Sequence, residues 1–256
     1  MSAAPDFSLA GQCALITGAT QGLGWAIAQA YAASGAHVIV NGRTAHKVEQ
    51  RVQELSELGY QATPLVLDVA NLEQHRDALA RLQDKARPRI LVNNVGIRVR
   101  KSLQDASLND ILSLIHTDLT ACVHLSKCVA ADLVQQGSGG RIITMTSIAG
   151  ELARAGDAIY PVAKQGLVGL VRALAVEYGP YGITSNGIAP GTFATESNAG
   201  LAADPVKSAV VVGRNPMGRW ASPTEITGAA VFLASRSASY VNGHVLVVDG
   251  GFSVTF

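Results

Sequence analysis

Short apolar runs rich in valine and isoleucine alternate along this chain with longer segments whose apolar residues recur at helical spacing. The short runs cover residues 13–17, 37–41, 62–67, 89–93, 140–146, 183–188 and 245–248. The helical segments cover residues 23–34, 44–58, 72–85, 108–136, 160–178 and 223–234. Continuous apolar runs of this kind are typical of parallel strands buried on both faces. Their strict alternation with helices predicts an α/β fold: a doubly wound, seven-stranded parallel sheet with helices on both faces.

The whole chain, residues 1–256, is expected to form one domain. It contains no internal repeat, low-complexity tract or linker that would separate two domains. The longest stretch without a periodic pattern, residues 190–216, follows the sixth predicted strand. Ligands of doubly wound sheets bind beyond the carboxyl ends of the strands, so this stretch is predicted to be a substrate loop.

Charge and cysteine content narrow the class of partner and the compartment. The 20 basic and 19 acidic residues leave a net charge of +1, which gives no overall field for nucleic acid or an anionic membrane and favours a small-molecule partner. The three cysteines, Cys13, Cys122 and Cys128, lack the spacing of a zinc site or a disulfide scaffold. With no signal-like amino terminus and no uninterrupted apolar run of about 18 residues, we expect a cytoplasmic protein that does not span a membrane.

A glycine-rich turn follows the first predicted strand and leads directly into a helix. It reads Thr17-Gly18-Ala19-Thr20-Gln21-Gly22-Leu23-Gly24. Gly18 permits a tight turn, Gly22 lets the backbone approach a pyrophosphate, and Gly24 allows helix and strand to pack closely. Glycine also serves turns that bind nothing, but the strand before and the helix after supply the context of a Rossmann-type dinucleotide site. The residues predicted to bind cofactor here are Gly18, Thr20, Gln21, Gly22, Leu23 and Gly24.

The end of the second predicted strand indicates which nicotinamide cofactor is bound. About 20 residues past the glycines, an acid holds the ribose 2′-hydroxyl of NAD, whereas an arginine accommodates the phosphate of NADP. This chain has Asn41-Gly42-Arg43-Thr44 there, with no carboxylate. Arg43 is either merely solvated or shares an anion with the following helix N-terminus, and the second interpretation favours NADP(H). Asp68, after the third strand, either accepts a hydrogen bond from adenine or caps the next helix.

Tyr160 and Lys164 form a candidate proton-transfer pair. They lie four residues apart at the start of a predicted helix, so both side chains share one face. A free tyrosine has a pKa of about 10, and a neighbouring ammonium together with a helix N-terminus favours the phenolate. Ser147, just past the fifth strand, is placed to donate to the same substrate oxygen. Each feature alone is common, and a serine after a strand often only caps a turn, but the combination is rare.

Taken together, these features resemble the short-chain dehydrogenase/reductase family, over essentially the whole chain. The family has the Thr-Gly-x-x-x-Gly-x-Gly turn, the upstream serine and the Tyr-x-x-x-Lys pair in this order. Further similar segments are Asn93-Asn94-Val95-Gly96, Pro190-Gly191-Thr192 and Val248-Asp249-Gly250-Gly251. The resemblance implies hydride transfer between nicotinamide C4 and a carbonyl or alcohol carbon, with Tyr160 handling the proton and Lys164 also holding the nicotinamide ribose.

The resemblance extends the set of cofactor contacts and implies an oligomeric state. The additional residues expected to contact the cofactor are Asp68, Val69, Asn94, Gly96, Pro190, Gly191 and Thr192. The last predicted strand resembles one that often packs in the family's tetramer interfaces, so a homotetramer is expected.

One position departs from the family pattern. The proton relay of the family usually includes an asparagine in the helix before the fifth strand, and the best match here is Asp118. In the family, the main-chain carbonyl of that residue holds a water near the catalytic lysine, so the role can survive a change of side chain. A buried carboxylate near Lys164 would nevertheless raise the pKa of the lysine and alter its effect on Tyr160.

Basic residues follow the fourth predicted strand, beside the expected site of hydride transfer. They lie in Asn94-Val95-Gly96-Ile97-Arg98-Val99-Arg100-Lys101. Basic loop residues are usually only solvated, but a guanidinium is suited to binding a carboxylate. Residues 93–98, 190–196 and 239–244 are particularly similar to gluconate 5-dehydrogenases within the family, which interconvert gluconate and 5-ketogluconate. This similarity implies a sugar acid with Arg98 on its carboxylate and Glu196 or Asn198 on its hydroxyl groups.

Two other functions stay open. Reduction of a 3-oxoacyl thioester or another ketone would use the same site, because substrate preference transfers poorly within a fold. A catalytically silent NADPH sensor would keep the nucleotide site without chemistry, and only Asp118 favours it. No metal site is predicted, because the six histidines are scattered, without His-Glu-x-x-His or paired Cys/His spacing.

Overall fold

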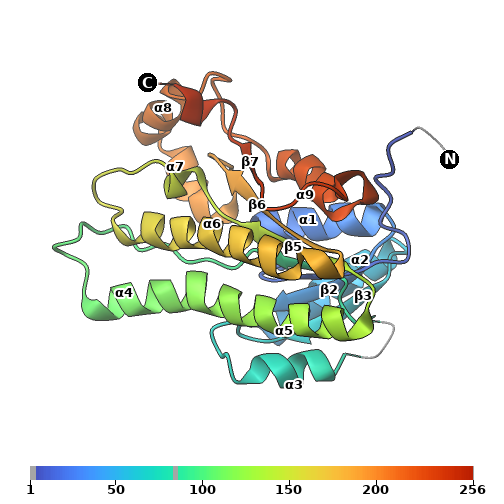
Figure 1. Ribbon diagram of the computed structural model, residues 1–256. Coiled ribbons are helices and arrows are strands. Elements are labelled where there is room, and N and C mark those ends of the chain that lie inside the picture. The colour runs from blue at the N-terminus through green and yellow to red at the C-terminus, as the bar shows by residue number, and fades with distance from the viewer. Residues whose placement is uncertain (1–3, 83–85, 256) are drawn as a thin grey trace.

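A single sheet organises the protein, whose computed structural model describes residues 4–82 and 86–255. In this part of the chain the sheet has seven strands, and all neighbouring strands run parallel (Figure 1). The strands are β1 (Cys13–Ile16), β2 (His37–Gly42), β3 (Ala62–Val66), β4 (Ile90–Asn93), β5 (Gly140–Met145), β6 (Ile183–Pro190) and β7 (Val245–Val248). Their order, β3-β2-β1-β4-β5-β6-β7, confirms the predicted doubly wound fold.

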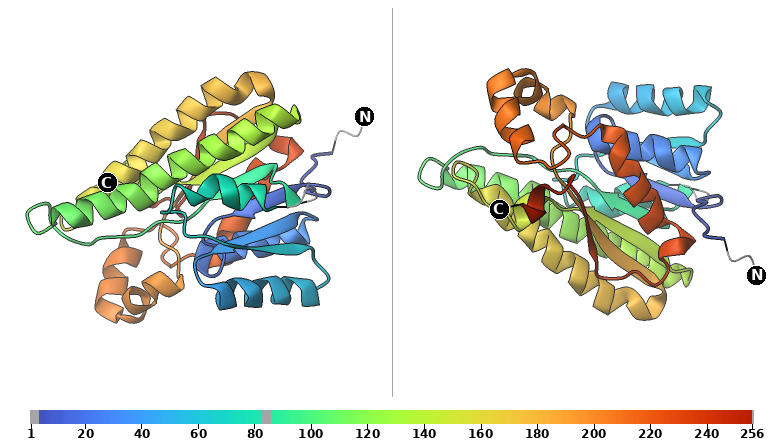
Figure 2. Two further views of the ribbon diagram at one scale, coloured as in Figure 1. Left: turned by 90° about the horizontal axis from the view of Figure 1, so that it is seen from below. Right: turned by 90° about the horizontal axis from the view of Figure 1, so that it is seen from above.

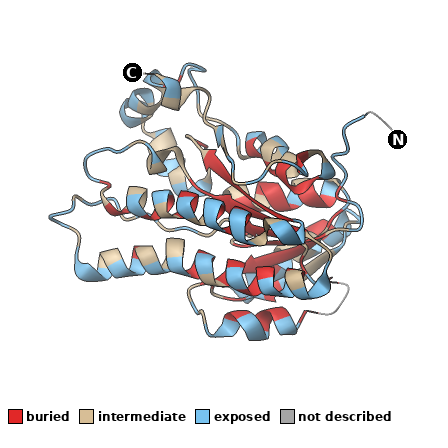
Figure 3. Cartoon of the chain, in the orientation of Figure 1, coloured by how far each residue is buried: buried red, intermediate tan, exposed pale blue. Residues whose placement is uncertain are grey.

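Helices cover both faces of the sheet, as the two opposite views in Figure 2 show. One face packs against α1 (Gly22–Ala33), α2 (Ala45–Glu57) and α9 (Thr227–Ala234). The other packs against α3 (Gln74–Ala80), α5 (Ala121–Gln136) and α6 (Ile159–Tyr178). Successive residues of β1 pack on opposite faces of the sheet: Ala14 belongs to the apolar core under α1, α2 and α9, and Leu15 to the core under α3, α5 and α6. Figure 3 shows the buried strands between the two helical layers. This two-sided burial is the reason that the strands read as continuous apolar runs.

The strand order reverses between β1 and β4, which pair directly with each other. From β1 the chain moves to β2 and β3 on one side, and from β4 it moves to β5, β6 and β7 on the other. Ligands of doubly wound sheets bind outside the carboxyl ends of the strands at such a reversal. The glycine-rich turn follows β1 and the basic segment follows β4, so the fold brings these two segments together at the reversal.

The predicted helix over residues 108–136 is wrong in one respect, because a π-turn interrupts it. The structure has α4 (Leu108–Ile115), the π-turn His116–Thr120, and then α5. A π-turn adds one residue to a helical turn and often occurs at functional sites. Asp118 lies within it and is fully buried. A single helical period therefore cannot describe both halves of this segment.

The prediction of one irregular stretch over residues 190–216 is also wrong. This stretch contains α7 (Ala199–Ala203) and α8 (Pro205–Gly213). The side chain of Asp204 accepts hydrogen bonds from the backbone N–H groups of Val206 and Lys207, and so caps the start of α8. No residue of α8 is buried, so the helix has no apolar stripe facing the core that the sequence could reveal.

Other elements differ from the predictions mainly at their ends. The helix predicted over residues 72–85 is regular over Gln74–Ala80, and residues 83–85 lie outside the described part of the chain. The segment predicted as a helix over residues 223–234 begins with the 3₁₀ turn Pro223–Ile226, which Ser222 and Glu225 cap reciprocally.

Among the described residues, one helical segment is long and apolar enough to cross a membrane by length and composition, Ile159–Tyr181. It includes α6, which packs on the sheet through Leu174 and carries the buried Lys164. The core helix of a globular protein passes the same test of length and composition. Its place against the sheet explains the apolar composition.

Candidate active site

The glycine-rich turn adopts the geometry that its glycines permit. Gly18 and Gly22 have φ values of +63° and +57°, in the left-handed region that favours glycine. At Gly24, an added Cβ would lie 2.5 Å from both Nδ2 of Asn94 and the carbonyl oxygen of Gly18. The turn therefore has no room for a side chain where α1 crosses the end of β1, as the sequence predicts.

Hydrogen bonds from neighbouring strands hold the turn in place. Asn94 donates from Nδ2 to the carbonyl oxygens of Thr17 at 2.9 Å and Gly18 at 3.3 Å. The hydroxyl of Thr17 accepts from the backbone N–H of Asn94 at 2.8 Å. Asn41 accepts from the N–H of Gly18 at 3.3 Å, while its amide donates to the carbonyls of Leu65 and Leu67. The ends of β1, β2, β3 and β4 are thus joined around the turn.

The N-terminus of α1 is suited to an anion. Its N-cap residue, Gln21, makes no capping hydrogen bond with its side chain, and its first turn contains no acidic residue. The first N–H groups of a helix have no partner within the helix and favour a phosphate. Together with the glycine cradle, this end of α1 fits the pyrophosphate of a dinucleotide. Leu23 packs against the apolar core below, and Arg51 donates to the carbonyl oxygen of Thr20 at 3.0 Å.

Arg43 lies at the carboxyl end of β2, where the sequence places it. Its side chain is 75% exposed, and Nη1 lies 3.8 Å from Oδ2 of Asp68. Oδ1 of Asp68 accepts from the N–H of Ala70 at 3.0 Å, which is a local turn contact. Asp68 therefore stabilises a local turn and does not cap the next helix, because α3 begins at Gln74 with Glu73 as its N-cap. Its other oxygen faces Arg43. The weak, exposed ion pair leaves the guanidinium accessible to a phosphate.

Tyr160 and Lys164 meet at the amino end of α6, as predicted. Nζ of Lys164 lies 5.3 Å from the centre of the Tyr160 ring and donates to the carbonyl oxygen of Met145 at 3.3 Å. Ser147 begins the short 3₁₀ turn Ile148–Gly150, which packs against α6. Its Oγ accepts from the N–H of Ala149 at 3.1 Å, so the serine caps this turn. Its hydroxyl hydrogen is donated to no group in the described part of the chain and can reach a substrate oxygen.

Asp118 forms a buried ion pair with Lys164. Its Oδ2 lies 3.3 Å from Nζ, and its Oδ1 accepts from the N–H of Ile97 at 2.7 Å. Burial raises the pKa of the Asp118 carboxyl, although Lys164 and the N–H of Ile97 oppose this shift. Burial alone would lower the pKa of the Lys164 ammonium, but the influence of Tyr160 and Asp118 raises it on balance. The carboxylate is thus part of the lysine's surroundings.

Gly96 permits this arrangement. An added Cβ would lie 2.9 Å from Oδ2 of Asp118 and 3.1 Å from Nζ of Lys164. The chain after β4 therefore passes directly over the ion pair, two residues after Asn94 binds the glycine-rich turn. This short segment connects the predicted cofactor turn with the predicted proton-transfer pair.

The predicted substrate residues lie in three different surroundings. Arg98 binds Asp157 through Nε at 2.9 Å and also through Nη2, with its guanidinium carbon 4.6 Å from the centre of the Tyr160 ring. Asn198 accepts from Arg100 at 3.4 Å and donates to the carbonyl of Phe193 at 3.1 Å. Glu196 faces the glycine-rich turn, since its Oε2 lies 3.5 Å from an added Cβ at Gly22. Arg98 and Arg100 thus lie near Tyr160, whereas the Glu196 carboxylate faces the predicted phosphate site.

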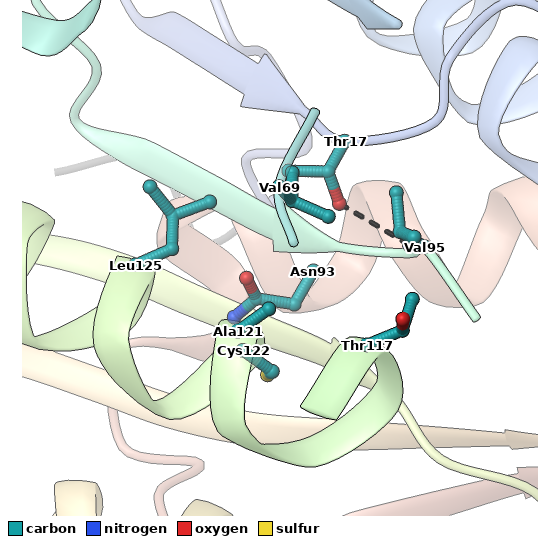
Figure 4. Close-up of a pocket in the computed structure, with 8 residues that line it drawn as sticks. All are labelled: Thr17, Val69, Asn93, Val95, Thr117, Ala121, Cys122 and Leu125. Atoms are coloured by element: carbon teal, nitrogen blue, oxygen red, sulfur yellow. Dashed lines mark hydrogen bonds between the residues drawn. The ribbon is translucent and has the colours of Figure 1, made fainter. Parts of the chain in front are cut away.

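The remaining predicted cofactor residues lie along the same edge of the sheet. Pro190 ends β6 beside Val248, and an added Cβ at Gly191 would lie 2.6 Å from Cβ of Asp249. The carbonyl of Thr192 accepts from the N–H of Ala221 at 3.0 Å. Val69 lines a cavity of about 10 Å³ behind the turn, large enough for about one water (Figure 4). The other residues lining this cavity are Thr17, Asn93, Val95, Thr117, Ala121, Cys122 and Leu125.

Four residues with a place in this site were not predicted from the sequence: Thr17, Asn41, Asp157 and Thr195. Thr17 and Asn41 are buried polar residues at strand ends, a pattern that the sequence does contain and that indicates a hydrogen-bonding role. Thr195 lies against the glycine-rich turn, with Cγ2 3.6 Å from an added Cβ at Gly22. Asp157 gives no such signal, because its partner is 59 residues away. Among the described residues, no group of three or more His, Cys, Asp or Glu side chains could hold a metal ion.

Comparisons with known proteins cover almost the entire chain. Residues 18–253 match the family model described as enoyl-(acyl carrier protein) reductase. Gluconate 5-dehydrogenase of Gluconobacter oxydans (strain 621H) is 39% identical over 253 residues, which cover 98% of each protein. The 5-keto-D-gluconate 5-reductase of Escherichia coli (strain K12) is 36% identical, over 97% of this chain and 98% of that protein. The crystal structure of a gluconate 5-dehydrogenase from Burkholderia cenocepacia J2315 in complex with NADP and tartrate has a TM-score of 0.93 at 36% identity, and the match covers 98% of each chain.

Proposed function

Because the chain belongs to the short-chain dehydrogenase/reductase family, we propose that it transfers a hydride between NADP(H) and the secondary alcohol or ketone of a sugar acid, such as gluconate and 5-ketogluconate. One observation carries the proposal. The segment after β4 binds the glycine-rich turn through Asn94 and, two residues later, crosses the Lys164–Asp118 pair at Gly96. A dinucleotide held by the turn would therefore end beside Tyr160.

The residues present fit NADP(H), which when bound supplies or accepts the hydride at nicotinamide C4. The glycine cradle and the uncapped N-terminus of α1 would hold the pyrophosphate, and Arg43 would bind the 2′-phosphate. Asn94, Gly96 and the segment Pro190-Gly191-Thr192 would line the nicotinamide half. The exposed guanidinium of Arg43, with no acid directly following β2, favours the phosphorylated cofactor.

Tyr160 carries the proton in this proposal. During alcohol oxidation its Oη accepts the hydroxyl proton of the substrate, and during ketone reduction it donates a proton to the carbonyl oxygen. Ser147 donates its free hydroxyl hydrogen to the same oxygen. The buried ammonium of Lys164 stabilises negative charge on the tyrosine, and Asp118 moderates that effect because its carboxylate lies 3.3 Å away.

The arginines beside Tyr160 supply the binding site for a carboxylate. Arg98 uses Nε and Nη2 for Asp157, so Nη1 is the part of its guanidinium left for substrate. Burial lowers the pKa of Arg100, and the neighbouring cations Arg98 and Arg154 lower it further. We therefore assign the sugar-acid carboxylate to Arg98 Nη1 and Arg100, and a hydroxyl group to Asn198, which contacts Arg100.

Nicotinamide absorbance with purified protein tests the proposal. The assays pair D-gluconate with NADP⁺ or NAD⁺ and 5-ketogluconate with NADPH or NADH, with Tyr160→Phe as the control. We expect turnover that prefers the phosphorylated cofactor and falls by about 1,000-fold in the variant. Turnover only with 3-oxoacyl thioesters or neutral ketones would replace the substrate class and keep the chemistry. NADPH binding without turnover on any carbonyl compound would instead indicate a sensor.

The oligomeric state and compartment complete the proposal. Apolar side chains are exposed on α5, α6 and β7, among them Val123, Val162, Val176 and Val247, and a homotetramer would cover such surfaces. All three cysteines are free and buried, which suits a reducing cytoplasm. Light scattering after size-exclusion chromatography should give four times the 26.6 kDa chain mass, and cell fractionation should recover the protein in the cytoplasm.

A further inference from the structure

Arg98 and Asp157 form an ion pair beside the tyrosine that donates or accepts the proton. Nε and Nη2 of Arg98 both donate to one oxygen, Oδ2 of Asp157, the first at 2.9 Å. The other carboxylate oxygen, Oδ1, is buried and has no hydrogen-bond partner among the described residues. Arg98 is therefore the residue that hydrogen-bonds this carboxylate in the described part of the chain, and a buried carboxylate without such a partner is strongly disfavoured.

The pair fixes the guanidinium above the Tyr160 ring. The Asp157 side chain is 2% exposed and that of Arg98 is 33% exposed, so a buried anion holds a half-buried cation. The guanidinium carbon lies 4.6 Å from the ring centre, within the distance at which a cation is attracted to an aromatic face. A planar guanidinium that donates two of its N–H groups to one carboxylate has little freedom to leave this position.

The pair also joins two segments that must stay aligned. Arg98 belongs to the segment after β4, which carries Gly96 over the lysine, and Asp157 lies just before α6, which carries Tyr160. The N–H of Ala158 donates to the carbonyl of Lys101 at 3.4 Å, so a backbone contact lies beside the ion pair. In the same segment, Ile97 and Val99 pack against the small apolar cluster that contains Leu114 and Ile159.

We propose that Arg98 and Asp157 act as positioning residues for Tyr160, with Asp157 holding Arg98 in place and Arg98 holding the tyrosine ring. The proposal rests on the proposed role of Tyr160, and it gives Arg98 a function beyond any contact with a substrate carboxylate. A residue that only binds the carboxylate changes KM, whereas a residue that orients the proton donor changes kcat at saturating substrate.

Steady-state kinetics of Arg98→Met, Asp157→Asn and the double variant test this proposal. The assay uses any ketone that the wild type reduces in a Tyr160-dependent manner, so it does not depend on the sugar-acid assignment. We expect each single variant to lower kcat about 30-fold with KM for NADPH within about twofold. The double variant should lose no more than Arg98→Met does, because Asp157 acts through Arg98. Arg98→Lys, which keeps the charge but loses the planar contact, should recover only part of kcat.

Matched controls separate positioning from stability. Arg219→Met also removes an arginine from an ion pair, with Glu225, and should leave kcat unchanged. Thermal unfolding identifies variants that lose the fold, and the double variant avoids leaving a buried charge alone. The proposal would be overturned if the loss of kcat in the double variant equalled the product of the two single-variant losses. It would also be overturned if the variants changed only the KM of an anionic substrate. Wild-type turnover in Tyr160→Phe would instead remove the proposed role of the tyrosine itself.

Discussion

The two sides of the site are held together by different kinds of interaction. The glycine-rich turn is fixed chiefly by neutral groups, since Thr17, Asn41 and Asn94 bind its backbone with hydroxyl and amide groups. The surroundings of Tyr160 are fixed by charge, through the pairs Lys164–Asp118 and Arg98–Asp157. The glycine-rich turn depends on close backbone packing, so an added side-chain carbon should disturb it. The surroundings of Tyr160 depend on opposite charges in a buried setting, so charge changes and pH should disturb them.

The largest effect should follow the loss of the buried ammonium. Lys164→Met leaves Asp118 without its cation and removes the charge that we propose stabilises the tyrosinate. We expect turnover to fall by about 1,000-fold and the free energy of unfolding to fall by about 3 kcal/mol. Urea denaturation and absorbance assays measure the two changes.

A double variant separates these two consequences. Lys164→Met combined with Asp118→Asn leaves no unpaired buried charge, so most of the stability should return while turnover stays low. Recovery of turnover in the double variant would contradict the assigned role of the lysine.

On the neutral side, a single added methyl group should have the next largest effect. Gly24→Ala places a Cβ 2.5 Å from Asn94 and Gly18, and overpacking of this kind costs about 1–3 kcal/mol. We expect the Kd for NADPH, measured by fluorescence titration, to rise by about 10-fold to 100-fold. The matched control is Gly228→Ala in α9, where an added Cβ meets nothing within 4 Å. Equal affinity in both variants would show that the turn tolerates bulk.

Arg43 adds a positive charge to the side of the site that holds the glycine-rich turn. Arg43→Ala should raise KM for NADPH by about tenfold and leave KM for NADH within about twofold, because only NADPH carries the 2′-phosphate. Lys47→Ala, which removes an exposed cation from the first turn of α2, controls for a general loss of positive charge. Equal changes for both cofactors would remove Arg43 from the phosphate site.

The smallest change in turnover should come from Asp118→Asn, with a shift in pH dependence instead. The ionised carboxylate of Asp118 opposes the formation of a negative charge on Tyr160. Its removal should therefore move the acidic limb of the pH profile for alcohol oxidation to lower pH, by on the order of one unit. Turnover at the plateau should stay within about twofold. A profile that does not move would exclude Asp118 from the proton relay.

The same variant should change stability in a defined pH range. Because burial raises the pKa of Asp118 in the folded protein, the wild type loses stability as pH rises from the usual aspartate range through that raised pKa. Asp118→Asn should lack this decrease. Urea unfolding at several pH values between about 4 and 7 measures the difference.

Local patterns in the sequence account for most of the fold and for two parts of the site, the glycine-rich turn and the proton-transfer pair. The sheet follows from apolar runs, the turn from Gly18, Gly22 and Gly24, and the proton-transfer pair from the helical spacing of Tyr160 and Lys164. These features are local, since each depends on residues within a few positions of one another. The exposed α8 could not be predicted because none of its residues is buried.

Contacts between distant segments could not be predicted. Arg98 was expected to meet a substrate, but its partner Asp157 lies 59 residues further on, and nothing near either residue indicates the pair. Glu196 was likewise assigned to substrate, whereas its carboxylate lies against Gly22. Such contacts arise from the path of the chain over the sheet edge, which a linear pattern does not specify.

The π-turn between α4 and α5 has a consequence for how this segment tolerates changes in length. One extra residue in a helical turn shifts the phase of every side chain that follows, so α4 and α5 present their apolar sides in different registers. Deleting a single residue from 116–120 would restore a regular α-helix and rotate the two halves relative to each other by about 100°. Depending on the residue deleted, Asp118 or the α5 residues that follow it would then face a different direction although their identities were unchanged. At this point the number of residues, as much as their chemistry, determines which group faces the lysine.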